Sequence, residues 1–148
     1  MGKKKKFSKK TQFISVEVVL KTNHKCDKFV KWYEKQDNCV VKLKWDTHKW
    51  YVYFAPLPSK NPDKTIKAIC KDISSLPKGV RKEWDKADFR EFNIGYHAGE
   101  EPFSYLDNIS SKTIKKVEKL KAGIGISLYA AELTDKKGIP KDFYDENN

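Results

Sequence analysis

Apolar and polar residues follow two different periods along this chain. Every second side chain from Ile14 to Leu20 is apolar, which is the period of a strand with one buried face. Between 26 and 33 the apolar residues recur at i, i+3, i+4 and i+7, the spacing of one helical face, and Asn23 is a candidate cap for that helix. Residues 39–55 alternate again and are rich in aromatic and β-branched side chains, so they predict a hairpin.

The second half of the chain repeats this mixture of periods. Asn61-Pro62-Asp63 offers a capping residue, a proline for the first turn and an acid beside the helix dipole, so it predicts the start of a helix. The elements predicted after it are a short helix over 77–86, a strand over 89–96, a helix that begins at Ser110 or Ser111 and ends near Gly123, and a strand over 124–130.

This order predicts an α+β fold. Amphipathic helices that alternate with half-buried strands must cover a sheet, so we expect a mainly antiparallel sheet covered on one face by two to four helices, with a ferredoxin-like element. The expected organisation is a flexible lysine-rich tail at 1–11, a single α+β domain at 12–133 and a polar tail at 134–148.

The positive charge is concentrated at the N-terminus. The formal net charge is +11, and the first ten residues contain six lysines and no acid, which leaves +5 for residues 11–148. Like charges cannot pack against one another, so they favour contact with a polyanion. The predicted electrostatic binding residues are Lys3, Lys4, Lys5, Lys6, Lys9 and Lys10.

Targeting signals and cysteines limit where the protein acts. No stretch reaches the roughly 18 apolar residues of a membrane span, and Lys6 stands where a myristoylation signal needs Ser or Thr. The three cysteines are odd in number and lack a Cys-x-x-Cys spacing. We therefore expect no membrane partner and a cytoplasmic location, or a nuclear one if the chain is eukaryotic.

The titratable residues do not form a recognisable catalytic or metal-binding pattern. His24, His48 and His97 lack partners at a ligand spacing, and a metal site needs three or four converging ligands. The loop from His97 to Glu101 could hold an acid–base pair or could simply be a polar connection. Asp107 suits a turn that leads into the last helix. We expect no catalytic residues, no metal and no cofactor.

The predicted hairpin interleaves lysines with aromatic rings. Stacking rings beside ammonium groups suit single-stranded nucleic acid. The same pattern is also produced by a strand pair with its aromatic stripe in the core and its lysines in solvent. The candidate residues of this hairpin surface are Lys42, Lys44, Trp45, Lys49, Trp50, Tyr51 and Tyr53.

A resemblance covers mainly residues 89–130. The strand from Phe89, the step Tyr105-Leu106-Asp107 before a helix, and the closing Ile126-Ser127-Leu128-Tyr129 resemble a family of small uncharacterised bacterial α+β proteins. Some relatives in this family are suspected immunity-type proteins encoded beside toxins. The resemblance implies an α+β fold and a role in protein recognition.

Two functions are compatible with these features. The first is a non-enzymatic protein-binding module, of an immunity or counter-defence type, whose basic tail engages an acidic partner surface. The alternative is a nucleic-acid-binding protein that uses the lysine tail and the aromatic hairpin. With only Arg81 and Arg90 in the chain, such binding would tolerate many base sequences, because specific readout of guanine favours arginine.

Overall fold

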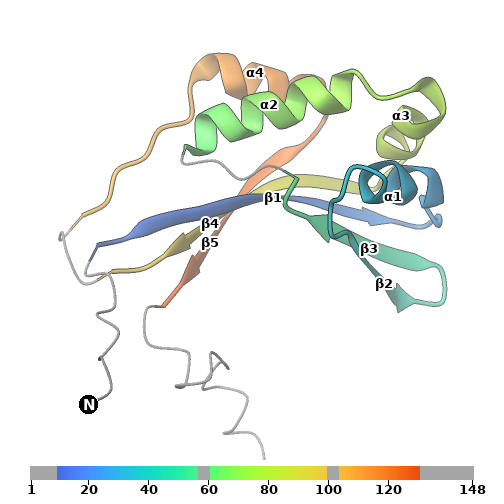
Figure 1. Cartoon of the computed structure of the whole chain (residues 1–148), viewed down its shortest axis with the longest axis horizontal. Helices are drawn as coiled ribbons and strands as arrows, with labels where there is room; N and C mark the ends of the chain where they lie inside the picture. The colour runs from blue at the N-terminus through green and yellow to red at the C-terminus, as the bar shows by residue number, and fades with distance from the viewer. Residues whose placement is uncertain (1–9, 57–60, 100–103, 131–148) are drawn as a thin grey trace, which may run out of the picture.

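The computed structural model describes residues 10–56, 61–99 and 104–130. In these residues five strands and four helices follow the predicted order (Figure 1). Their bounds are β1 (Gln12–Thr22), α1 (Asp27–Glu34), β2 (Val41–Asp46), β3 (Lys49–Phe54), α2 (Pro62–Ser74), α3 (Lys78–Asp85), β4 (Phe89–His97), α4 (Ser111–Lys119) and β5 (Gly123–Tyr129).

The five strands form one sheet in the order β2-β3-β1-β4-β5. The first three neighbouring pairs are antiparallel, and β5 lies parallel to β4. Strands β1 to β4, with the helices between them, have the alternation and strand order of a ferredoxin-like unit. Helix α4 and strand β5 extend that unit by one strand, so the predicted mainly antiparallel α+β fold is confirmed.

All four helices lie on one side of the sheet (Figure 1). They form two packed pairs, α1 with α3 and α2 with α4. We call this side the covered face; Val16, Val18 and Leu20 of β1 point into it and are fully buried. The opposite side, toward which Glu17 and Lys21 of β1 project, is the open face, and none of the four described helices lies over it.

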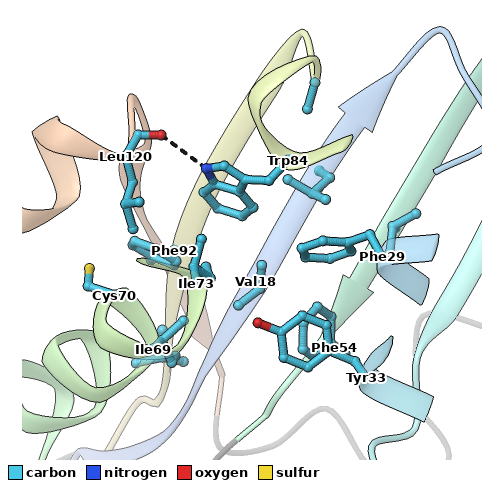
Figure 2. Packing of buried hydrophobic residues seen from close by; sticks show 14 of the residues in the cluster. Val18, Phe29, Tyr33, Phe54, Ile69, Cys70, Ile73, Trp84, Phe92 and Leu120 are labelled. Carbon is cyan, nitrogen blue, oxygen red and sulfur yellow. Dashed lines mark hydrogen bonds between the residues drawn. The ribbon is translucent and has the colours of Figure 1, made fainter. Parts of the chain in front are cut away.

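The core centres on Trp84 of α3 (Figure 2). Its ring lies 6.0 Å from the ring centre of Phe29 and 6.1 Å from that of Phe92, and it has no exposed surface. The indole Nε1 donates a hydrogen bond of 3.2 Å to the backbone oxygen of Leu120. This bond supplies the acceptor that a buried indole N–H needs. Through its ring contacts and this bond, Trp84 links α1, β4 and the end of α4.

Two of the predicted helix caps are confirmed. The side chain of Asn61 accepts from the backbone N–H of Lys64 at 3.0 Å, and that of Ser110 accepts from Thr113 at 3.3 Å. These oxygens satisfy donors that the first turn of a helix leaves without partners.

Two other predicted helix ends are wrong. Cys26, not Asn23, precedes α1; its φ of 39° lies in the left-handed region, and its side chain makes no capping bond. At the end of α4 the left-handed residue is Lys121, with φ of 52°, and Gly123 already begins β5. At both positions the left-handed residue is not glycine, the residue that usually marks this conformation in a sequence. The sequence therefore did not reveal where these two helix ends lie.

Asp63 joins the starts of α2 and α4. Its carboxylate accepts from the backbone N–H of Ser110 at 2.8 Å and from Lys67 at 3.2 Å. A hydrogen bond from the Thr113 hydroxyl, together with these two, holds the pKa of Asp63 well below its usual range. Asp107, predicted to accept backbone N–H bonds ahead of the last helix, accepts one from Asn108 at 2.9 Å and also accepts from the Tyr96 hydroxyl at 3.0 Å.

Candidate functional site

The strand register divides the predicted hairpin surface between the two faces of the sheet. On β3, Tyr51 pairs with Leu43 of β2 and with Lys21 of β1. Tyr53 likewise pairs with Val41 of β2 and with Val19 of β1. Directly paired residues share a face. The stripe of β2 that contains Leu43 therefore lies on the open face. Of the two readings of the hairpin, the one that places its aromatic stripe in the core does not hold for Leu43 and Trp45, which are exposed.

Lys42, Lys44 and Trp50 lie on the covered side. Trp50 pairs with Thr22 and Lys44, and Lys42 pairs with the fully buried Val52. The ammonium of Lys42 lies 4.5 Å from the centre of the Trp50 ring and forms an ion pair with Asp27 at the start of α1. This half of the hairpin thus holds β2 against α1, and the predicted seven-residue surface is not continuous.

The other half of the hairpin joins residues of β1 and β4 on the open face. The ammonium of Lys21 lies 4.9 Å from the ring centre of Phe89 and 5.7 Å from that of Trp45. Lys49 approaches the same Trp45 ring at 5.7 Å. We call the set that these contacts connect the aromatic surface: Lys21, Leu43, Trp45, Lys49, Tyr51, Tyr53 and Phe89.

The aromatic surface combines large exposed side chains with a shallow hollow. Trp45 is 66% exposed and Leu43 is 52% exposed. The hollow has a volume of about 310 Å³ and is lined by Lys21, Leu43, Lys44, Trp45 and Tyr51. Exposed aromatic and aliphatic groups gathered around a hollow mark a surface that interacts with another molecule.

Acidic groups lie beside the two tyrosines. The rings of Tyr51 and Tyr53 are 5.4 Å apart. Partial burial raises the pKa of Tyr51, and the charges of Glu17 and Glu91 raise it further. The open face therefore carries lysines toward β2 and carboxylates toward β4, a mixed charge pattern.

A second hollow, of about 290 Å³, lies over β1, β4 and the end of β5. It is lined by Ile14, Ser15, Glu17, Asn93, Gly95, His97 and Tyr129. His97 lies on an exposed end of β4, and its ring centre is 6.2 Å from that of Tyr129. Glu100 and Glu101, the carboxylates considered with His97, lie outside the described residues. Within the described part of the chain, no group of three or more His, Cys, Asp and Glu residues could hold a metal ion.

Most of the predicted electrostatic binding residues fall outside the part of the chain that the structure describes. Lys3, Lys4, Lys5, Lys6 and Lys9 lie outside the described residues, and Lys10 is exposed just before β1. No helix of the described ranges is both long enough and apolar enough to cross a membrane.

Sequence reasoning missed three members of the aromatic surface: Lys21, Leu43 and Phe89. Lys21 and Phe89 are far apart in sequence and meet only because β1 pairs with β4 in a register that sets them opposite each other. The period-two pattern of each strand shows which residues share a face. It does not show which face the helices cover.

Comparisons of this chain with protein-family models, with curated proteins and with solved structures found no match. The function must therefore be argued from the surface itself. The resemblance of residues 89–130 to the bacterial family stays a prediction.

Proposed function

We propose that this protein is a non-enzymatic binding module that holds an acidic protein partner on its aromatic surface. The observation that carries the proposal is the exposure of Trp45 and Leu43 around a hollow that Lys21 and Lys44 help to line, with Lys49 beside the Trp45 ring. An apolar side chain of the partner would fill the hollow, and Trp45 would close over it. Large aromatic residues supply most of the binding energy in such interfaces.

The arrangement of Lys21 supports this role. Its ammonium lies near two rings, so part of the entropy cost of fixing a long side chain is already met before binding. An ammonium fixed beside an apolar hollow favours a carboxylate that flanks the inserted side chain. The net charge of +11 adds a long-range attraction that speeds the encounter with an acidic protein.

The N-terminal lysines extend the same attraction in this proposal. Six ammonium groups within ten residues would meet acidic groups around the central contact. Exposed charges at the rim of an interface change the association rate and its salt dependence more than the dissociation rate. An immunity or counter-defence role, as the resemblance implies, would place such a partner among acidic effector proteins.

Single-stranded nucleic acid is the competing ligand. Trp45 with Lys21 and Lys49 could stack one base and contact its phosphate. However, Glu17 and Glu91 stand on the same face beside Tyr51, and their carboxylates would repel a phosphate backbone that continued across the sheet. The mixed charge of the open face therefore favours a protein.

A site-specific photo-crosslink tests the proposal. A photoreactive phenylalanine, which keeps a large aromatic ring at the site, would replace Trp45 in one variant of the full chain and Ile114 of α4 in a second, as a control on the covered side. In extract of the source cell, we expect a protein adduct at position 45 that is absent at 114. That protein, once purified, should bind the wild-type chain at least about tenfold more tightly than Trp45→Ala.

Three outcomes would overturn the proposal. The adduct at position 45 could be nucleic acid, with a salt-dependent affinity for oligothymidine that Trp45→Ala removes. The same proteins could crosslink at both positions. The purified protein could bind Trp45→Ala as well as wild type.

A further inference from the structure

The two edges of the sheet differ in how they are protected. Edge strand β2 carries Lys42, Lys44 and Asp46 among its six residues, and charges of this kind discourage pairing with another strand. Edge strand β5 reads Gly-Ile-Gly-Ile-Ser-Leu-Tyr and contains neither a charged residue nor a proline. Its outer edge, with which no described strand pairs, therefore lacks the usual barriers to a further strand.

The apolar residues of β5 are poorly covered. Ile126 and Leu128 pair with Ile94 and Tyr96 of β4 and so lie on the covered face. Ile94 is only 2% exposed, yet Ile126 is 71% exposed and Leu128 is 65% exposed. The helices thus bury β4 but leave its neighbour largely in solvent. An apolar row at a free sheet edge is the surface that β-strand addition uses.

We propose that β5 pairs with β5 of a second copy of this chain, antiparallel and two-fold symmetric about Ile126. This register sets Ile126 against itself and Ile124 against Leu128 on the covered face. On the open face it sets Gly125 against Ser127 and Gly123 against Tyr129. The two sheets would become one sheet of ten strands, with the helices of both copies on the same side.

The residue pattern of β5 argues for a second copy over another protein. In the proposed register every covered-face pair joins two aliphatic residues. On the open face each pair includes a glycine, so two bulky side chains never meet there. Gly125 also leaves room for Glu91, whose carboxylate occupies the position that a Cβ there would need. The strand is therefore complementary to its own reverse.

Charge gives this dimer a distinctive salt dependence. Each copy carries +11, so two copies repel each other at low salt, while the β5 seam itself holds no charge. Screening the repulsion should strengthen the dimer, whereas an acidic partner on the aromatic surface should bind more weakly as salt rises. Seven-residue strand pairing lies at the small end of specific interfaces, so the dimer should be concentration-dependent.

Sedimentation equilibrium of the full chain tests the proposal at about 0.05 and about 0.5 M NaCl. We expect a monomer–dimer equilibrium that shifts toward the dimer at the higher salt. Ile126→Lys should weaken dimerisation at least about tenfold. Leu43→Lys on the opposite edge should leave it unchanged. Wild-type chain that stays monomeric at both salts, or dimerisation that Ile126→Lys does not weaken, would overturn the proposal.

A disulfide experiment tests the register. In a Cys39→Ser background, which removes the exposed native thiol, Ile126→Cys places two thiols opposite each other across the two-fold axis. Air oxidation should give a covalent dimer for Ile126→Cys and little for Leu128→Cys, whose predicted partner is Ile124. The reverse ranking would contradict the proposed pairing. Circular dichroism confirms that each variant is folded, and partner binding by Ile126→Lys separates this proposal from that of the aromatic surface.

Discussion

The ammonium of Lys21 on β1 lies 4.9 Å from the ring centre of Phe89 on β4. The two residues are paired in the antiparallel register of these strands, and they project from the open face of the sheet. Trp45 approaches the same ammonium from β2, so residues of three strands meet there. This contact orders the aromatic surface without a ligand, and several consequences can be measured.

Replacing Lys21 with methionine separates its charge from its packing. Lys21→Met keeps a long apolar side chain and removes the ammonium, so the unfolding free energy should change by less than about 1 kcal/mol. Affinity for an acidic protein partner should fall several-fold, and the dependence of that affinity on salt should become weaker. Calorimetric titration at two salt concentrations measures both effects. An unchanged salt dependence would mean that Lys21 does not contact the partner's charge.

Trp84 should dominate the stability of the fold. Trp84→Phe removes the donor to the Leu120 carbonyl and part of a fully buried ring system, so it should cost about 2–4 kcal/mol of unfolding free energy. Trp45→Phe makes the same chemical change at an exposed position and should cost less than about 0.5 kcal/mol. Urea unfolding followed by circular dichroism compares the two variants. Equal losses would contradict the assignment of Trp84 to the core.

Asp63 should make stability depend on pH in the acid range. Its pKa in the folded chain is below the ordinary value of 3.8, so its ionised form favours folding. That stabilisation is fully present above about pH 4 and is lost as pH falls below 3.8 toward the lowered folded pKa. Asp63→Asn should lower the unfolding free energy at pH 7 by about 1–3 kcal/mol and flatten its decrease in acid. A mutant curve parallel to that of wild type between pH 5 and pH 2 would contradict this role.

The three cysteines should differ in reactivity. Burial raises the pKa of the Cys26 and Cys70 thiols to about 11, whereas Cys39 is exposed. The thiolate is the reactive form, so a thiol reagent at neutral pH should modify one residue in the folded chain and three after denaturation. Mass spectrometry of peptides identifies the labelled residue. Rapid labelling of Cys70 in the native protein would show that α2 and α4 separate readily.

The pattern of apolar positions was enough to predict the elements and the α+β class, because each strand and helix has one consistently apolar face. Asn61 and Ser110 were recognised as caps because their side chains act within their own helix. The order of the strands was not predictable, since it depends on pairings such as Lys21 with Phe89 that join distant segments. For the same reason the pattern of the hairpin could not decide between an exposed and a buried aromatic stripe. A period of two distinguishes two faces but does not show which one receives the helices.

The most direct test of the central claim compares two isomeric side chains of nearly equal exposure. Leu43 on the aromatic surface is 52% exposed, and Ile114 on α4 is 50% exposed. Each would be replaced by alanine in the full chain, and affinity for the partner identified by crosslinking at position 45 would be measured by calorimetry. Leu43→Ala should weaken binding about tenfold or more, and Ile114→Ala less than about twofold. Equal losses, or a larger loss for Ile114→Ala, would contradict a binding site on the open face of the sheet.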